Sequence, residues 1–452
     1  MKTYIENIHV EQAIKGIERL VAIPSYLQEP VENAPFGVPV RQCLTECLAL
    51  FKEEGFEVYE DPEGYYGYAE IGQGEKTMGI LCHLDVVPPG DLSLWKTNPF
   101  EAVVTETSLI GRGVQDDKGP SMAALYAVKA LRDAGVTFQH KIRFIFGTDE
   151  ENLWRCMSRY HEKEEQVDFG FVPDSKFPVI YAEKGLLQVY FEGPSVNGYE
   201  VSGGSALNVV PDEARFRKSD YQSLVSYFEK QGWPYQVDED EDVFIAKGRA
   251  IHSKSAPDGV NAISRLMVAL DSIQSDFLSQ LLGNKIGEDA NGLSLFGHIS
   301  DEMSGDLTFN VATLSADSEK TTIGLDIRMP VTTDKELILT QLEKVAQEYG
   351  FIYHEHDYLA SLYVPKESEL VQTLLQTYRD MTGDLREPQV NGGATYARAM
   401  KNCVAFGAMF KDTKDTMHQP NETWQRDELE MTMKIYAEAI YRLQQLNFYR
   451  MC

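Results

Sequence analysis

The feature that most constrains the fold is an alternation of apolar runs with an amphipathic helix pattern between residues 77 and 175. Residues 77–87, 141–151 and 169–175 contain apolar runs of strand length. Residues 121–135 have apolar side chains at helical spacing and end at a glycine. Strand, helix and strand in this order predict parallel strands with helices on the faces of the sheet, so we expect an α/β fold for this part of the chain.

The pattern changes after about residue 184 and returns near residue 365. In between, two-faced runs such as 186–193 and 321–329 predict strands separated by helical segments, which is typical of an α+β domain with antiparallel sheets. A chain of 452 residues also exceeds the size at which one core usually keeps growing. The expected boundaries are residues 1–186 and 365–452 for a catalytic domain, and residues 187–364 for an inserted domain.

The charge and the apolar pattern exclude several classes of partner. Seventy acidic and 42 basic side chains give a formal charge of -28, which repels nucleic acid and anionic membranes and attracts cations, although most of it is explained by solubility. The first residues lack the apolar core of a secretion signal, and no run approaches 18 uncharged apolar residues. We therefore expect a cytoplasmic protein, with Cys43 and Cys47 as buried thiols on one helix face.

Acidic and imidazole side chains gather where the predicted strands end or in the adjacent turns. They are His83, Asp85, Asp116, Asp117, Glu150, Glu151 and Asp174. Because the carboxyl ends of parallel strands meet at one edge of a sheet, these side chains are expected to converge there. His418 lies in a polar loop before the last predicted helix. Histidine and carboxylate ligands without cysteine suit zinc, manganese or cobalt.

These residue types match what a site for two metal ions requires. Such a site needs one carboxylate that bridges the ions and further ligands on each of them. Asp116 can bridge, His83 and Asp174 can complete one position, and Glu151 and His418 can complete the other. Each motif alone also has a structural explanation, as a turn or a solvated strand end. Their joint placement favours metal, because unpaired carboxylates are costly to pack together without cations.

Two further acidic residues are then left for catalysis. Glu150 lies beside a ligand and can take a proton from water. Asp85 follows His83 by two residues, on the same strand face, so its carboxylate can hold the second imidazole nitrogen and fix the tautomer.

Five motifs together make the chain recognisable over nearly its whole length. They are CHLDVVPPGD, GRGVQDDKGP, GTDEEN, VPDSKFPVIYAEKG and MHQPNE. This set resembles the dinuclear metallopeptidases that include carboxypeptidase G-type enzymes, aminoacylases and bacterial Xaa-His (carnosinase-like) dipeptidases, and it is most similar to the monomeric bacterial dipeptidase branch. The resemblance implies a zinc-peptidase-like catalytic domain with a mixed sheet flanked by helices, and an inserted α+β lid domain. From the length of the insert we expect two ferredoxin-like lobes and a monomer.

The resemblance also implies roles for individual residues. The implied metal ligands are His83, Asp116, Glu151, Asp174 and His418. The implied catalytic residues are Asp85, Glu150 and His252, the last of which supports the oxyanion. The implied substrate contacts are Asn208, Arg328, Gly393 and Thr395, although a turn or a strand-end charge explains each of these alone. One departure from the family pattern stands directly after the glutamates, at Asn152 and Leu153.

The sequence therefore predicts a metal-dependent dipeptidase that acts on Xaa-His, β-alanyl or a broad range of dipeptides. The expected cofactors are two divalent ions, zinc or manganese with cobalt as an alternative, and the expected partner is a small peptide. Two alternatives stay open at this point: an N-acyl amino-acid deacylase with the same chemistry, and a catalytically silent metal-binding module. The presence of Glu150 and Asp85 beside the ligands argues against silence. Ligand type does not select one metal, and nothing in the sequence sets the side-chain preference.

Overall fold

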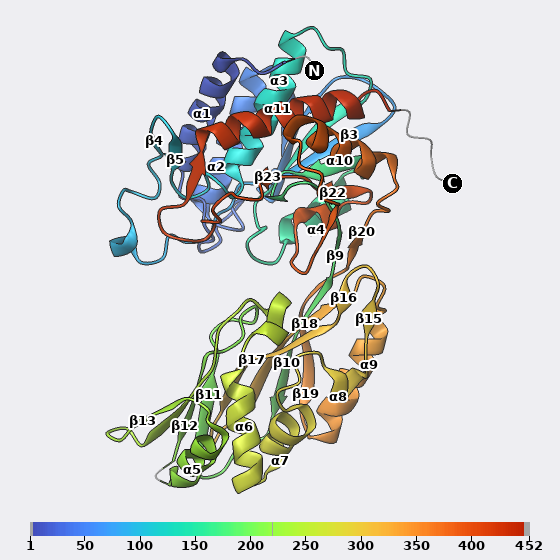
Figure 1. The fold of residues 1–452 in the computed structure, drawn as a ribbon. Coiled ribbons are helices and arrows are strands. Elements are labelled where there is room, and N and C mark those ends of the chain that lie inside the picture. The colour runs from blue at the N-terminus through green and yellow to red at the C-terminus, as the bar shows by residue number, and fades with distance from the viewer. Residues whose placement is uncertain (1–2, 219, 447–452) are drawn as a thin grey trace. The chain divides into compact units, whose positions relative to one another are not determined.

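The computed structural model describes residues 3–218 and 220–446, and its contacts divide the chain into two compact units (Figure 1). The first unit contains Met1–Tyr181, Tyr363–Gln389 and Thr395–Cys452. The second contains Ala182–Leu362 and the short segment Val390–Ala394. That short segment was expected in the catalytic domain.

The first unit is built on a mixed nine-stranded sheet. Eight strands follow the order β1-β2-β6-β3-β7-β22-β9-β20, and the ninth, β21, pairs with β9. Strand β3 pairs in parallel with β6 and β7, and β22 pairs in parallel with β7. Strands β1 and β2 are antiparallel. The bounds are β1 Glu57–Glu60, β2 Tyr66–Ile71, β3 Thr77–His83, β6 Lys141–Gly147, β7 Phe169–Val172, β9 Ile180–Glu183, β20 Leu362–Tyr363, β21 Gln389–Asn391 and β22 Cys403–Ala405.

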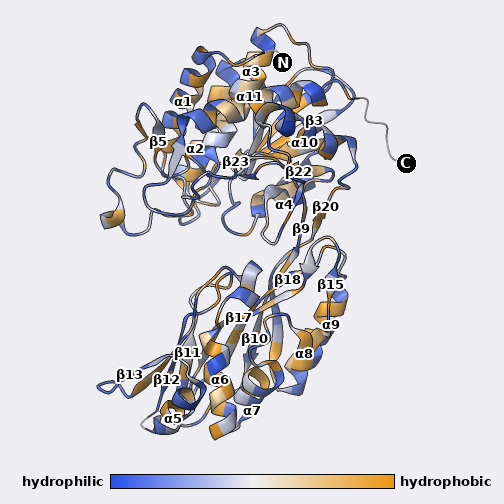
Figure 2. Ribbon diagram, in the orientation of Figure 1, coloured by the Kyte–Doolittle hydropathy of each residue, from blue (hydrophilic) through white to orange (hydrophobic). Residues whose placement is uncertain are grey.

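Helices cover this sheet, among them the one expected from the apolar spacing of residues 121–135. Their bounds are α1 Asn7–Val21, α2 Val38–Glu53, α3 Lys118–Asp133, α4 Arg155–Lys163, α10 Glu369–Thr382 and α11 Arg426–Leu443. Helix α3 packs against both α1 and α11, which explains why it is buried along most of its length. Apolar residues line these helices and the strands beneath them (Figure 2). The expected α/β fold with a mixed sheet is confirmed.

The second unit has one eight-stranded antiparallel sheet with the order β13-β14-β12-β11-β17-β18-β10-β19. The strands are β10 Gly185–Gly193, β11 Glu200–Gly203, β12 Glu213–Arg217, β13 Tyr235–Asp238, β14 Val243–Lys247, β17 Thr308–Ala316, β18 Thr321–Met329 and β19 Ile352–Leu359. The main helices are α5 Gln222–Gln231, α6 Ala262–Ile273 and α9 Lys335–Glu348.

The two lobes expected in this unit are two halves of that single sheet. Strand β11 pairs with β12 on one side and with β17 on the other, so hydrogen bonds run from one half into the other. One apolar core also contains residues of both halves, among them Leu266 of α6 and Leu342 of α9. The halves are therefore not separate bodies.

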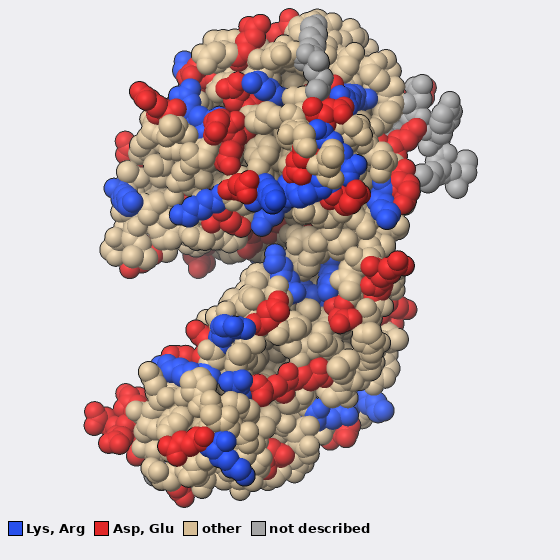
Figure 3. Space-filling model, in the orientation of Figure 1, with Lys and Arg blue, Asp and Glu red and all other residues tan. Residues whose placement is uncertain are grey.

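The visible surface carries charges of both signs, and Cys43 and Cys47 lie inside the protein. On the face seen in Figure 3, acidic and basic side chains are interspersed. Among the residues that the structure describes, no helix has the length and apolarity needed to cross a membrane. Cys43 and Cys47 are free and buried, which confirms that expectation.

Candidate metal centre

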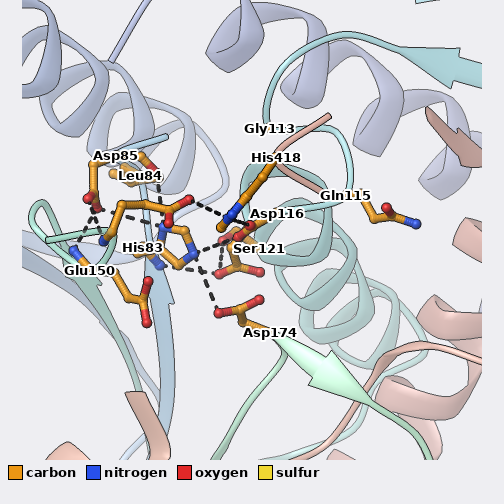
Figure 4. A network of polar contacts seen from close by, with 12 residues as sticks. His83, Leu84, Asp85, Gly113, Gln115, Asp116, Ser121, Glu150, Asp174 and His418 are labelled. Carbon is orange, nitrogen blue, oxygen red and sulfur yellow. Dashed lines mark hydrogen bonds and ion pairs between the residues drawn. The ribbon is translucent and has the colours of Figure 1, made fainter. Parts of the chain in front are cut away.

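The predicted ligands come from the carboxyl ends of neighbouring strands and from two loops of the first unit (Figure 4). His83 is the last residue of β3 and is 1% exposed. Glu150 and Glu151 follow the adjacent strand β6, and Asp174 follows β7 on the other side of β3. The remaining two ligands come from loops, because Asp116 precedes α3 and His418 precedes α11. The parallel order of the strands is what brings residues so distant in sequence to one edge.

The side chains form two groups that share Asp116. In the first group, His83 Nε2 lies 2.9 Å from Asp116 Oδ1 and 3.5 Å from Asp174 Oδ2. In the second group, His418 Nε2 lies 2.9 Å from Asp116 Oδ2 and 3.2 Å from Glu151 Oε1. The ligand atoms within each group all lie within 4.8 Å of one another. Each Asp116 oxygen thus faces a different histidine, as a carboxylate shared by two ions requires.

The electrostatics of the protein groups alone show why this cluster needs cations. Burial and the charge of Asp116 raise the pKa of Glu151 to about 7, and the same two causes raise the pKa of Asp174. Hydrogen bonds to Asp116 and Glu151 raise the pKa of His418 to about 11. For Asp116 itself, burial raises the pKa, but the contacts with both histidines outweigh burial and hold it below its usual range. Divalent ions at these nitrogen and oxygen atoms would supply the positive charge that bound protons otherwise supply.

Asp85 makes a different contact from the one expected. His83 Nδ1 lies 2.9 Å from the main-chain oxygen of Asp85 and 3.7 Å from its carboxylate, so the main chain, and not the side chain, contacts the second imidazole nitrogen at hydrogen-bond distance. The carboxylate instead accepts hydrogen bonds from the backbone N–H groups of Glu150, at 3.1 Å, and Glu151, at 3.0 Å. Asp85 therefore contacts both the imidazole of His83 and the loop that carries the two glutamates.

Glu150 belongs to neither ligand group but lies beside both. Burial raises the pKa of its carboxyl well above the ordinary value, and the negative charges of Asp174 and Glu151 add to this effect while His83 opposes it. A carboxyl with a raised pKa beside a metal site suits a group that accepts and then donates a proton.

The loop after Glu151, where the sequence departs from the family pattern, is held by Trp154 and Arg155. The Trp154 indole N–H donates to the Glu150 carbonyl at 2.8 Å, and the Arg155 guanidinium makes two hydrogen bonds of 2.7 Å to Asp149. Leu153 is 46% exposed and Asn152 is exposed as well. The departure is therefore confined to side chains that face outward, while the next two residues fix the loop. No pattern in the sequence indicated these roles of Trp154 and Arg155.

The remaining predicted residues lie mainly in the second unit. Asn208 and His252 are on adjacent segments, since Ser253 N–H donates to the Asn208 carbonyl at 2.9 Å. The surrounding protein desolvates the His252 ring and, with the positive charges of Arg328 and Lys254, lowers its pKa to about 4.

Arg328 is anchored inside this unit and is 4% exposed. Its Nε and Nη2 donate to the Asp326 carboxylate at 2.7 and 2.9 Å, and its Nη1 lies 3.5 Å from the Gly392 carbonyl. Gly393 follows in the same short segment. Thr395 belongs to the first unit, where its hydroxyl accepts a hydrogen bond from Ala397 N–H at 3.3 Å. The second unit thus brings together Asn208, His252 and Arg328, but not Thr395.

Comparison with known proteins agrees with this description. The model of peptidase family M20/M25/M40 matches residues 79–442. A protein of Staphylococcus aureus (strain bovine RF122 / ET3-1), whose name provisionally assigns it as a dipeptidase, is 36% identical, and the alignment covers 96% of this chain and 97% of the relative. A similar protein of S. aureus strain MW2 has the same identity and coverage.

Two solved structures share the fold over nearly the whole chain. Human carnosine dipeptidase 1 has a TM-score of 0.58 at 16% identity, with 97% of this chain and 98% of that chain covered. The di-peptidase Dug1p from Saccharomyces cerevisiae has a TM-score of 0.60 at 14% identity, with 98% of each chain covered. Since the family model matches most of the sequence, the chain belongs to peptidase family M20/M25/M40 and is a hydrolase.

Proposed function

We propose that the protein is a metal-dependent dipeptidase that holds two divalent ions, zinc or manganese with cobalt as an alternative. The observation that carries the proposal is the pair of ligand groups that share Asp116, with Glu150 beside them. The provisional dipeptidase names of the S. aureus relatives support the same activity. Two ions at these groups would polarise a peptide carbonyl and lower the pKa of water.

The chain's own residues then perform the proton transfers. Glu150 takes a proton from the attacking water and donates it to the nitrogen of the leaving amine. Asp85 holds the Glu150–Glu151 loop through two backbone N–H groups, so the base stays in place while its charge changes. His252 donates to the carbonyl oxygen as negative charge develops there, and Asn208 assists from the adjacent segment.

Arg328 is the proposed contact for the terminal carboxylate of the substrate. Asp326 accepts from Nε and Nη2, which fixes the plane of the guanidinium, and Nη1, which otherwise lies 3.5 Å from the Gly392 carbonyl, is the nitrogen proposed to bind the carboxylate. Gly393 and Thr395 are proposed as neighbouring substrate contacts. A site that requires a free amine near an acidic group and also binds the terminal carboxylate has room only for short peptides. Rapid cleavage of a long peptide contradicts this part of the proposal. The proposal also includes a monomer in the cytoplasm.

A metal-exchange assay with paired substrates tests the proposed activity. The protein is treated with a chelator, reloaded separately with zinc, manganese or cobalt, and assayed on a dipeptide panel and on the same dipeptides acetylated at the amino group. Chelation is expected to abolish hydrolysis and at least one metal to restore it, with free dipeptides preferred. Preference for the acetylated substrates would instead indicate a deacylase, and binding of metal without any hydrolysis would indicate a silent module.

Metal loading is expected to release protons, because ligating histidine must be neutral. With a pKa of about 11, the His418 ring is a positively charged imidazolium at pH 7, and Glu151, with a pKa of about 7, is partly protonated. The apparent affinity for zinc should therefore rise between pH 6 and pH 8. Calorimetric titration in two buffers of different ionisation enthalpy counts the protons, and at least one per chain is expected. Equal zinc affinity at both pH values would contradict the assigned ligands.

A further inference from the structure

Glu422 is a fully buried acidic residue at the centre of a hydrogen-bond cluster beside the proposed metal site. It is 0% exposed and directly precedes β24, Thr423–Gln425. One carboxylate oxygen, Oε1, accepts from the backbone N–H groups of Gln115 at 2.9 Å, Gly113 at 3.1 Å and Asp116 at 3.2 Å. The other oxygen accepts from Arg112 Nη1 at 2.7 Å. A single side chain thus binds the backbone of the loop that presents Asp116.

Gln115, which belongs to the loop that presents Asp116, in turn contacts the loop that leads to Glu422. Gln115 Oε1 accepts from Thr416 N–H at 2.9 Å and from the Thr416 hydroxyl at 3.0 Å. Gln115 Nε2 donates to the Lys414 carbonyl at 3.1 Å. In addition, Gly111 N–H donates to the Glu422 carbonyl at 3.0 Å. Residues 111–117 and 414–423 are therefore tied together by side-chain and backbone contacts in both directions.

These two loops carry Asp116 and His418, which lie 2.9 Å apart at Oδ2 and Nε2. Neither residue is in a strand or a helix, so the sheet does not fix the spacing of these two ligands. A buried carboxylate is costly unless it is fully hydrogen-bonded, and Glu422 meets that condition only while both loops keep this geometry. We propose that Glu422 is a positioning residue that sets the Asp116–His418 spacing and hence the metal affinity of the group that contains His418. This inference rests on the proposed two-metal function.

The effect is expected to be selective for one of the two ions. The group with Glu151 and His418 has two ligands on the tied loops, whereas the other group has only Asp116 there. His83 is held by β3, and Asp174 follows β7 by two residues. Loss of the Glu422 contacts should therefore weaken the His418 position about 10- to 100-fold, the usual range for groups that orient metal ligands, and the His83 position much less.

The experiment is a manganese titration of Glu422→Gln against the parent protein, because this change places an NH2 group where Arg112 Nη1 and Gly113 N–H now donate to Oε2. Two affinities are measured by calorimetry, and the electron paramagnetic resonance spectrum reports whether two manganese ions are coupled. The variant should bind one ion with nearly parental affinity and should show an uncoupled spectrum at concentrations that fill both parental positions. Asp276→Asn is the matched control, because Asp276 also accepts a backbone N–H, from Ser279 at 2.9 Å, but lies in the second unit. It should leave both affinities unchanged.

Gln115→Ala distinguishes the effect of the loop contacts from the effect of the Glu422 charge. It also provides a second test in case Glu422→Gln does not fold. It removes the second tie between the loops and keeps the negative charge of Glu422, so a smaller loss at the same position is expected. Unchanged affinities in both variants would overturn the inference, as would equal weakening of both ions. A lower melting temperature with parental affinities would reduce Glu422 to a structural residue. A parent protein that binds no pair of ions would refute the proposed function instead, so the two failures are distinguishable.

Discussion

Replacement of the proposed base, Glu150→Gln, is expected to lower kcat by about 10²- to 10⁴-fold, the usual contribution of a general base. The amide has the same shape but cannot accept the proton of the attacking water. Because Glu150 belongs to neither ligand group, the variant should still bind two ions, and its KM should change little. The measurements are kcat, KM and metal content on the same preparation.

The adjacent residue provides the matched control. Glu151→Gln makes the same chemical change one position along the chain, but Glu151 Oε1 lies 3.2 Å from His418 Nε2 in the second ligand group. This variant should therefore lose metal as well as activity, and added metal should partly restore its rate. If Glu150→Gln lost an ion in the same way, or kept the parental rate, the assignment of the base would be wrong.

Much of the first unit follows from local patterns in the sequence. The apolar run that ends at His83 forms β3, the pattern between residues 121 and 135 lies in α3, and the run after residue 141 forms β6. These three elements already place His83, Asp116 and Glu151 at one sheet edge, because parallel strands direct their carboxyl ends to the same side. The proposed ligands were predictable since strand ends and polar turns are local features of the sequence.

The contacts that hold the ligands in place were less predictable. The Asp85 carboxylate accepts hydrogen bonds from the backbone N–H groups of Glu150 and Glu151, which are 65 and 66 residues away. These contacts depend on how the loop after β6 packs beside the end of β3. Glu422 stands at the end of a polar loop, where an acidic residue is usually solvated, and only the packing of residues 111–117 against it explains its burial. Sequence spacing carries no information about either of these contacts.

The second unit shows the same limit on a larger scale. Its strands were expected from their alternating pattern, but the pairing of β11 with β17, Val201 opposite Ala316, joins positions more than a hundred residues apart. Such long-range register is set by the tertiary fold rather than by any local signal. This pairing joins the two expected lobes into one sheet, which the local patterns did not indicate.

The shared ligand leads to the other large expected effect, because Asp116 is the only described residue that belongs to both ligand groups. Asp116→Asn should reduce metal loading from two ions to at most one and should abolish hydrolysis. The new amide keeps one oxygen that can bind an ion, but its NH2 group cannot replace the oxygen that faces the second histidine. His418→Ala should likewise leave one ion, held by His83 and Asp174, and metal content after dialysis against zinc or manganese measures both variants.

The neighbouring aspartate makes this test specific. Asp117 is 0% exposed, and its Oδ2 accepts from His83 N–H at 3.2 Å and from the Ser121 hydroxyl at 3.1 Å. Burial, followed by the charge of Asp174, raises the pKa of Asp117 well above its ordinary value, and Asp117 belongs to neither ligand group. Asp117→Asn should therefore still load two ions. If this variant lost metal while Asp116→Asn kept both ions, the bridging role would belong to Asp117 and the proposed site would have to be rebuilt around it.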